Sequence, residues 1–379
     1  MKIGVFSTDW QFRPAPDLDR SCDGKIVDHR TRKLARYGGC FYYRCAMPYH
    51  ELAKNGYEVV LSWAFETAPD GHIRVLDALG QEWHDDCDVI VFQRWMRDNG
   101  PQIAADARAA GQVIINDIDD QFWAIPDTNF GKQFSDPDKN PDFNRDHYRK
   151  MLGESSAITV STPALAHSLS RMGVPVFLLR NAIEIDRWPQ RDPAEPGMVG
   201  WVGGIPWRAN DLPILKGVIG PYLKDNGLSF YHGGHAPKFG GKSAWDQMDI
   251  DIDRVDVFHR TMVGIDQYPR LWEPINLAVI PIEDCTFNRA KSWLKGLEAS
   301  ACGIPFVASA LPEYKELGVG RLAKTPNQWR RHLEELLDPE VRRVEGAANR
   351  KRAEELSIAN TWPQWAEMLN QVTRQPVAA

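Results

Sequence analysis

The sequence is 379 residues long and 43% hydrophobic, with a formal net charge of −6 at pH 7. This length suits two ordinary α/β domains, and the apolar fraction is that of a globular protein rather than a disordered chain. The acidic balance gives no general attraction for nucleic acid or anionic membranes, so binding of either kind depends on local charge.

The cysteines and the N-terminus indicate a reducing compartment. Six cysteines are scattered without C-x-x-C spacing, which indicates neither a zinc site nor a disulfide framework. The opening residues MKIGVFSTDW run directly into a short apolar strand, so we expect no signal peptide. No run approaches ~18 uninterrupted apolar residues, so we expect no transmembrane segment. A cytoplasmic location follows as an expectation.

The first half of the chain alternates strand-like and helical segments. The strand-like runs are KIGVF, YEVVLSW, DVIVFQR, QVIIND and AITVST, separated by helical stretches such as MPYHELAKNG and PALAHSLSRMG. This alternation predicts a parallel, doubly wound sheet. VPVFLLRNAIEIDRWP closes the run, and the proline-rich stretch after it has the composition of a linker. We expect a first domain over residues 1–188.

A second α/β run begins at Met198 and supplies strands in MVGWVGG, LSFYHGG, RVDVFHRTM, LAVIPI, PFVAS and GVGRLAK. It predicts a second domain over residues 189–355, followed by a C-terminal helical segment over residues 356–379. Two Rossmann-like halves then face each other across a cleft, and ligands of such sheets bind beyond the carboxyl ends of the strands.

The segment from Ile280 to Ser309 reads strand, polar loop, helix, Gly-Ile-Pro turn, strand. Free N–H groups and the helix dipole favour a phosphate where the loop enters the helix. A carboxylate further along the helix suits the hydroxyls of a ribose. The polar side chains in question are Asn288, Lys291, Ser292, Lys295 and Glu298. A solvated helix face is the alternative interpretation of the two lysines.

This order resembles the donor-binding region of GT-B glycosyltransferases, especially glycosyltransferase family 4 and its bacteriophage-encoded relatives. Their E-A-x-A-x-G-x-P motif stands here as Glu298 to Pro305. The resemblance implies two Rossmann-like doubly wound domains, a C-terminal helix that crosses back onto the first domain, and a nucleoside-diphosphate sugar as co-substrate. It also implies retention of anomeric configuration and no metal or other cofactor. Lys291 and Ser292 would hold the diphosphate and Glu298 the ribose.

One position departs from the family pattern. Family 4 enzymes usually carry a second glutamate eight residues before the ribose glutamate, credited with touching the transferred sugar, and Ala290 stands there.

Two glycine-rich loops are further donor-site candidates. Gly203 and Gly204 follow a strand and let the backbone approach a ligand, while Arg208 presents a planar fork of donors to phosphate. The loop resembles the G-R-x-x-x-x-K-G loop of family 4 in its glycines and one basic residue. A tight turn with a solvent-facing arginine is the alternative. Gly38 and Gly39 resemble the glycine-rich loop of the GT-B N-terminal domain.

The residues after that second loop are acceptor-side candidates. Tyr43 suits stacking on a sugar or base, with buried packing as the alternative, and Arg44 precedes the following helix. Before the loop, a long connection ends in KIVDHRTRKLARY, whose basic residues would attract an anionic acceptor or form a solvated charge run. These residues include Lys25, Arg30, Arg32, Lys33 and Arg36.

Carboxylates gather at the end of another strand. Asp117, Asp119 and Asp120 could orient or deprotonate an acceptor hydroxyl, with Asp119 the first choice. Asp-x-Asp is also the manganese motif of GT-A glycosyltransferases, but the two-domain organisation favours a metal-free role. Gln93 and Arg94 end the neighbouring strand and are candidates for the same rim.

The sequence thus predicts a glycosyltransferase, hexosyl or pentosyl, with Lys291 among its catalytic residues. A hydroxymethylpyrimidine of phage DNA is the acceptor that the phage resemblance and the basic run favour; virion protein, lipid-linked sugar and cell-wall glycan stay open. We expect the protein in the cytoplasm of the bacterial cell that produces it or is infected. Ala290 keeps open a second interpretation, a nucleotide-sugar binding module without turnover. The two-domain architecture keeps open a third, another sugar enzyme or an oxidoreductase. The missing G-x-G-x-x-G counts against NAD. Nothing in the sequence defines the oligomeric state.

Overall fold

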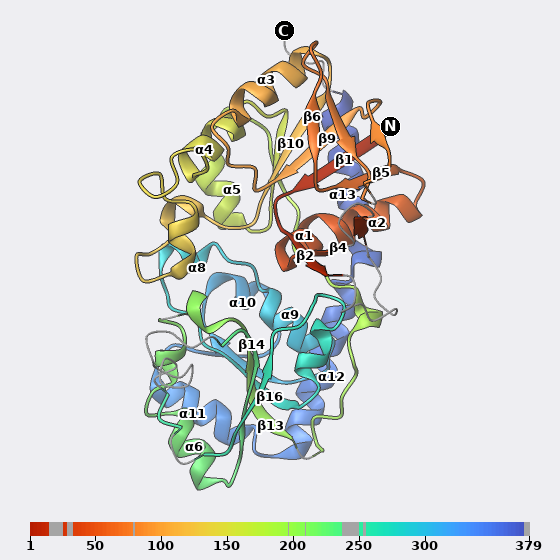
Figure 1. Cartoon of the computed structure of the whole chain (residues 1–379). Coiled ribbons are helices and arrows are strands. Elements are labelled where there is room, and N and C mark those ends of the chain that lie inside the picture. Colours follow the sequence, from red (N-terminus) through yellow and green to blue (C-terminus); the bar gives the residue numbers. More distant parts are fainter. Residues whose placement is uncertain are drawn as a thin grey trace.

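The structure is a computed structural model that describes residues 1–14, 26–28, 33–78, 80–195, 197–208, 210–236, 250–252 and 255–374. For residues 10–14, 26–28 and 33–36 only the backbone is described. Each half of the chain forms a six-stranded, wholly parallel sheet flanked by helices (Figure 1). The predicted pair of doubly wound, Rossmann-like units is therefore confirmed. The domain boundaries expected at residues 188 and 355 stay predictions.

The N-terminal sheet has the order β12-β11-β10-β9-β1-β5. Its strands are Val176–Leu178 (β12), Ala157–Val160 (β11), Val113–Ile118 (β10), Val89–Gln93 (β9), Lys2–Ser7 (β1) and Glu58–Ser62 (β5). All five residues of β9 are buried, as expected for a strand covered by helices on both faces. Asp117 lies in register with Gln93 and Gln93 with Ser7, so the carboxyl ends of three strands meet at one edge.

The C-terminal sheet has the order β15-β14-β13-β16-β17-β18. Its strands are Val257–Thr261 (β15), Phe230–Gly234 (β14), Met198–Val202 (β13), Ile275–Ile280 (β16), Phe306–Ser309 (β17) and Arg321–Ala323 (β18). The order reverses direction between β13 and β16. The crevice beside such a reversal, at the carboxyl ends of the strands, is where ligands of these sheets bind.

Helices connect the strands in both halves. The N-terminal half has Gly39–Phe41 (α1), a π-helical turn at Tyr42–Ala46, Met47–Lys54 (α2), Gly100–Ala109 (α3), Arg145–Gly153 (α4) and Pro163–Leu169 (α5). The C-terminal half has Ile219–Asp225 (α6), Thr286–Arg289 (α8), Leu294–Ala301 (α9), Pro312–Leu317 (α10), Pro326–Glu335 (α11) and Pro339–Glu355 (α12). Short 3₁₀ turns lie at Phe122–Ala124, Phe130–Phe134, Ile185–Arg187, Ile205–Trp207, Leu212–Leu215 and Tyr268–Trp272. No helix in the described ranges is long and apolar enough to cross a membrane.

The long connection after β1 is not a plain loop. Trp10–Pro14 (β2), Ile26–Asp28 (β3) and Lys33–Tyr37 (β4) form an antiparallel sheet with β4 in the centre. Part of the basic run that we expected in a loop is thus strand. A second antiparallel sheet joins Phe65–Thr67 (β6), Ile73–Leu76 (β7) and Trp83–His84 (β8).

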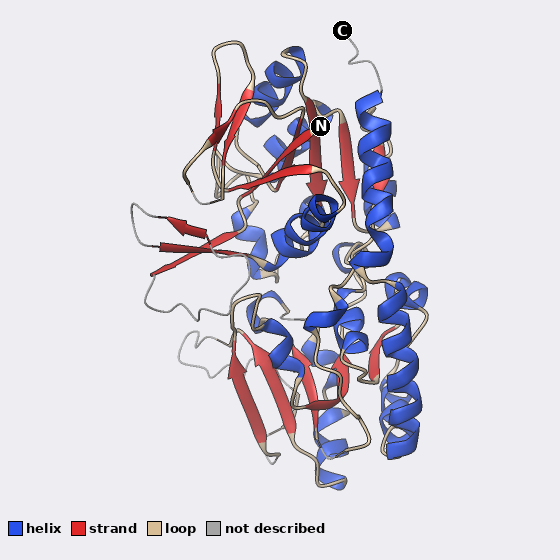
Figure 2. Cartoon of the chain, turned by 90° about the vertical axis from the view of Figure 1, so that its right-hand side faces the viewer, coloured by secondary structure: helices blue, strands red, loops and turns tan. Residues whose placement is uncertain are grey.

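The last helix, Ile358–Arg374 (α13), leaves the C-terminal half and packs on the N-terminal half (Figure 2). The N–H of Ile358 donates to the carbonyl of Ile183 over 2.8 Å, and the ring of Trp365 meets that of Tyr49 in α2 edge-on at 5.7 Å. The crossing helix that the resemblance implied is therefore confirmed.

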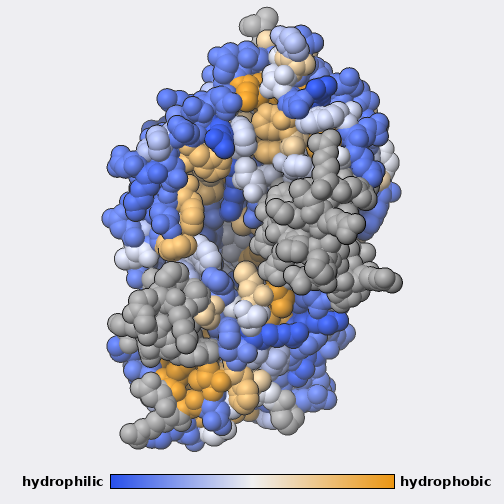
Figure 3. All heavy atoms as spheres, in the orientation of Figure 1, coloured by the Kyte–Doolittle hydropathy of each residue, from blue (hydrophilic) through white to orange (hydrophobic). Residues whose placement is uncertain are grey.

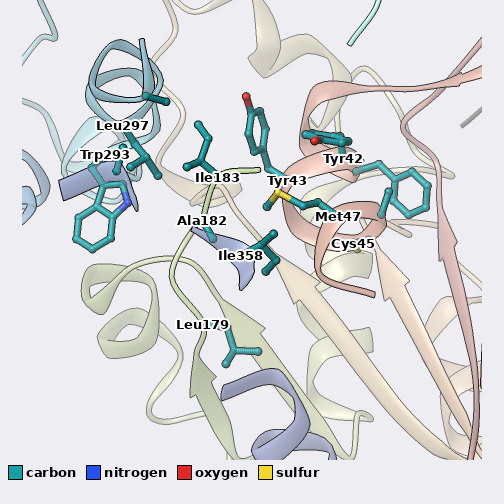
Figure 4. Close-up of a cluster of buried hydrophobic side chains, with 14 of the residues drawn as sticks. Tyr42, Tyr43, Cys45, Met47, Leu179, Ala182, Ile183, Trp293, Leu297 and Ile358 are labelled. Carbon is teal, nitrogen blue, oxygen red and sulfur yellow. The ribbon is translucent and has the colours of Figure 1, made fainter. Parts of the chain in front are cut away.

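Apolar side chains of both halves form one cluster where the two units meet (Figure 4). Leu179, Ala182 and Ile183, on the stretch after β12, lie in this cluster with Tyr43 from the first half and Leu297 from the second. Each of the five is at most 5% exposed. This packing holds the carboxyl edges of the two sheets toward a common space.

Candidate functional site

A cleft of about 520 Å³ lies between the two halves, and Figure 3 shows the molecule hollowed there. Twelve of the residues singled out from the sequence line it. From the N-terminal half these are Gly39, Tyr43, Arg44, Asp119 and Asp120; from the C-terminal half they are Gly203, Gly204, Arg208, Lys291, Ser292, Lys295 and Glu298. The cleft therefore brings the donor-binding candidates of the second half and the aspartates of the first half into one space.

Glu298 lies in α9 with a side chain that is 1% exposed. Its carboxylate accepts hydrogen bonds from the hydroxyl of Tyr43 over 3.1 Å, from the hydroxyl of Tyr268 over 2.9 Å, and from the ammonium of Lys295 over 2.9 Å. Burial raises the pKa of both tyrosines, so both hydroxyls keep their protons and act as donors. The carboxylate is thus fixed in place and contacted from both halves of the molecule.

Lys291 lies just before α9 and reaches across the cleft. Its ammonium lies 2.8 Å from Asp120 Oδ1. Asp120 also accepts from Arg94 over 3.2 Å, and the same guanidinium clasps both oxygens of Asp119 at 2.9 and 2.8 Å. Burial opposes ionisation of Asp120, but Lys291 and Arg94 outweigh it and hold its pKa below the ordinary value. The site therefore places the side chains of Asp119 and Asp120 next to the two cations Arg94 and Lys291.

Arg94 owes its position to an unusual backbone. Its φ of 60° lies in the left-handed region, which side chains other than glycine adopt at a cost. This residue directly follows β9, and its guanidinium contacts the two aspartates that follow β10. Arg94 does not itself line the cleft.

The glycine-rich loop after β13 is positioned by the strand beside it. The N–H of Gly203 donates to the carbonyl of Gly233 over 2.9 Å, and a Cβ on Gly234 would meet the Gly203 oxygen at 2.1 Å. Only glycine tolerates that approach together with the φ of +143° at Gly234. The loop carries Arg208, which pairs with Asp211 at 3.0 Å.

Ser292 is tied to the first half through Asn181, whose amide donates to its hydroxyl over 2.8 Å. The indole of the next residue, Trp293, donates to the carbonyl of Asn181 over 3.1 Å. The start of α9 is therefore anchored to the segment that joins the two halves.

Arg44 and Asp117 occupy different places from those expected. Arg44 touches the cleft wall, but its guanidinium is 1% exposed and donates to Asp117 at 2.7 Å, to the carbonyl of Leu179 and to Asn181. Asp117 is equally buried and also accepts from Thr159 over 2.7 Å. Both groups are therefore engaged inside the core, where they join the sheet to its neighbours. Their predicted roles toward an acceptor stay predictions.

Three other candidates lie behind the cleft surface. Gln93 is fully buried and accepts from Ser7. Asn288 donates to Asp211 over 3.2 Å and to the carbonyl of Glu283 over 3.0 Å, which supports the loop that precedes α8. The N–H of Gly38 donates to the carbonyl of Asp9 over 2.8 Å.

The basic run falls largely outside the described residues. Lys25, Arg30 and Arg32 lie there, and Lys33 and Arg36 lie on β4 with undescribed side chains. Ala290 is fully buried and its carbonyl accepts from Thr162 over 2.9 Å. That position therefore supplies no carboxylate to the cleft.

Sequence reasoning missed several residues of the cleft. Tyr268 and Tyr314 reach it from segments without a motif, and Asp9 reaches it from the end of β1. Nothing in the local sequence marks any of the three, because their role depends on which strand ends meet. In the described part of the chain no group of three or more His, Cys, Asp or Glu side chains is arranged to hold a metal ion.

Two parallel sheets that face one cleft, with a last helix that returns to the first unit, are the architecture of the GT-B fold. Solved structures agree. Sucrose-phosphate synthase from Thermosynechococcus elongatus is 12% identical with a TM-score of 0.61, and the match covers 98% of each chain. HepE from Anabaena, in complex with UDP and glucose, is 14% identical with a TM-score of 0.58 over 98% of this chain and 100% of that one.

AviGT4, a glycosyltransferase involved in avilamycin A biosynthesis, is 13% identical with a TM-score of 0.55 over 99% of both chains. At such identities the likeness establishes the fold: the chain has the GT-B fold. No protein-family model and no curated protein matches the sequence.

Proposed function

We propose that this protein is a glycosyltransferase that moves a sugar from a nucleoside-diphosphate sugar to an acceptor hydroxyl. The observation that carries the proposal is the content of the cleft. Two cations suited to a diphosphate, Arg208 and Lys291, lie with a buried carboxylate suited to a ribose, Glu298, and face a pair of aspartates on the other half.

The chemistry fits that arrangement. In the transfer, the bond between the anomeric carbon and the β-phosphate oxygen breaks, and a bond to the acceptor oxygen forms. The leaving diphosphate gains negative charge, and cations already aimed at it lower the barrier. The acceptor proton leaves to Asp119, to Asp120 or to the departing phosphate. No step calls for a metal ion, because Lys291 and Arg208 supply the positive charge.

The solved neighbours support a nucleotide-sugar donor. One HepE structure contains UDP with glucose and another contains UDP. UDP-sugars are therefore the first donors to test, followed by GDP- and ADP-sugars. Retention of anomeric configuration is the finer proposal, supported by the family 4 resemblance of the Glu298 motif. The anomeric coupling constant of the product, read by proton NMR, distinguishes retention from inversion.

For the acceptor, we propose a hydroxymethylpyrimidine of phage DNA as the first candidate, on the strength of the basic run from Lys25 to Arg36. A hydroxyl of virion protein, lipid-linked sugar or cell-wall glycan is the alternative. Incubation with donor and hydroxymethylated DNA, followed by nucleoside mass spectrometry, decides between them. A glycosylated nucleoside supports the first candidate, and unmodified DNA beside a glycosylated glycan removes it.

A nucleotide-sugar binding module without turnover is a second candidate function, and the burial of Ala290 favours it. The absence of a carboxylate from that position leaves the transferred sugar to contacts from Asp119, Asp120 and their neighbours. Donor binding measured by calorimetry, together with donor hydrolysis measured by NMR, tests both functions. Binding with hydrolysis supports the enzyme, and binding without hydrolysis or transfer to any acceptor supports the module.

A further inference from the structure

The hydroxyl of Tyr314 is a buried polar group that lacks a partner. Tyr314 lies in α10 and lines the cleft, with a side chain that is 2% exposed. Among the described residues that line the cleft, it alone has a buried side-chain oxygen or nitrogen without a hydrogen-bond partner. Because an unsatisfied buried hydroxyl destabilises the protein, such a group in a binding cleft points to a ligand that supplies the missing partner.

The hydroxyl of Tyr314 keeps its proton and can donate it. Burial raises the pKa of Tyr314 above its ordinary value, against the nearby positive charge of Arg208. The other charges that act on it are the carboxylates of Glu298, Asp211 and Glu313. The phenol therefore keeps its proton and requires an acceptor.

The nearby carboxylates already have donors. Glu298 accepts from Tyr43, Tyr268 and Lys295. Asp211 accepts from Arg208, from the N–H of Glu283 and from Asn288. Since neither these carboxylates nor any other described group accepts from Tyr314, an acceptor from outside the protein would satisfy the hydroxyl, and the nearby positive charge of Arg208 favours an anion.

The ring itself is held in place. A Cβ on Gly296 of α9 would lie 3.1 Å from Cε1 of Tyr314, so the ring packs closely on that helix, two residues before Glu298. The hydroxyl is closed to water, so a ligand reaches it when a covering side chain moves. Arg208 is the charged neighbour that a phosphate would draw away from Asp211.

We propose that Tyr314 donates a hydrogen bond to the α-phosphate of the nucleoside-diphosphate donor. This inference rests on the proposed function. If Glu298 holds the ribose while Arg208 and Lys291 hold the diphosphate, the α-phosphate lies between Glu298 and the two cations. Tyr314 lines the same part of the cleft as these residues. The α-phosphate carries its charge before and after transfer, so the bond contributes to donor binding more than to turnover.

Tyr314→Phe removes one oxygen and tests the proposal. UDP and UMP are the probes, with GDP and GMP or ADP and AMP if the wild type prefers another base, and binding is measured by calorimetry. We expect the Kd for the diphosphate and the monophosphate to rise about tenfold or more, with kcat nearly unchanged. The parent nucleoside lacks the phosphate, so its affinity, measured by ligand-observed NMR, should not change.

Tyr49→Phe is the matched control, because the Tyr49 hydroxyl is also buried and unpartnered in the described structure but lies on α2, away from the cleft. It should leave every affinity unchanged. Tyr314→Phe should unfold at the same or a higher temperature than wild type, since it deletes an unsatisfied group.

The outcomes separate the two proposals. Wild-type protein that binds no nucleotide overturns the proposed function and this inference with it. If wild type and Tyr314→Phe bind the monophosphate equally tightly, the inference alone is overturned. A loss of affinity for the nucleoside equal to that for the monophosphate also overturns it, because the hydroxyl would then act on the ribose or the base.

Discussion

The ammonium of Lys291 and the carboxylate of Asp120, 171 positions apart in the chain, lie 2.8 Å apart across the cleft. A diphosphate that binds Lys291 competes with this carboxylate for the same cation. Donor binding would then leave Asp120 with Arg94 as its remaining partner. Its affinity for a proton would rise at the moment when an acceptor hydroxyl has to lose one.

Replacing Lys291 with Met should depress turnover more than donor binding. The ammonium faces charge that grows on the leaving phosphate, and losing one such donor costs about 10²–10³ in kcat. Steady-state kinetics with calorimetric donor affinities measure the split. Lys315→Met, on an exposed face of α10, is the control. Normal turnover with weakened donor binding would place Lys291 in ground-state binding only.

Asp119→Asn should leave donor and acceptor affinities nearly intact and lower transfer by about 10²–10⁴. The carboxamide keeps the shape of the side chain but cannot accept a proton. Asp127→Asn is the control, since that carboxylate is 89% exposed and pairs with Lys132. Full transfer activity in Asp119→Asn would move the proton to Asp120 or to the departing phosphate.

Arg44→Met should destabilise the fold by about 3–5 kcal/mol, because it leaves the Asp117 carboxylate buried without its cation. Adding Asp117→Asn should restore much of the loss, since the uncompensated charge disappears. Urea unfolding of the single and double variants measures both effects. A stable Arg44→Met protein with weakened acceptor binding would return Arg44 to the acceptor side.

Glu313 should make stability depend on pH. Burial raises its pKa from 4.5 to about 7, against the favourable pairing with Arg180 at 3.1 Å. A folded-state pKa above the unfolded one gives stability that is complete below pH 4.5 and is lost as the pH rises to about 7. The shift corresponds to about 3 kcal/mol. Melting temperatures between pH 5 and 8 should decline in wild type and stay level in Glu313→Gln; parallel curves would contradict this.

Both sheets could be predicted because buried parallel strands are continuous apolar runs, as in β9 and β16. The positions of Lys291 and Glu298 followed from a motif whose spacing places Lys291 just before α9 and Glu298 within it. The partners of polar residues could not be predicted. Arg44 and Asp117, 73 positions apart, look like site residues in the sequence, and only the folded chain shows that the π-helical turn at Tyr42–Ala46 brings Arg44 against Asp117 in the core. The contact of Tyr268 with Glu298 likewise depends on how a 3₁₀ turn meets α9.

The central claim is that the cleft binds a nucleoside-diphosphate sugar through Glu298 and the cations beside it. The most direct measurement is a calorimetric titration of wild type and Glu298→Gln with UDP-, GDP- and ADP-sugars, since Gln keeps the shape of Glu. We expect wild type to bind at least one donor and the variant to lose about 1.5–3 kcal/mol for each charge-assisted bond to the ribose. A wild-type protein that binds none of these donors, or a variant with unchanged affinity, would contradict the claim.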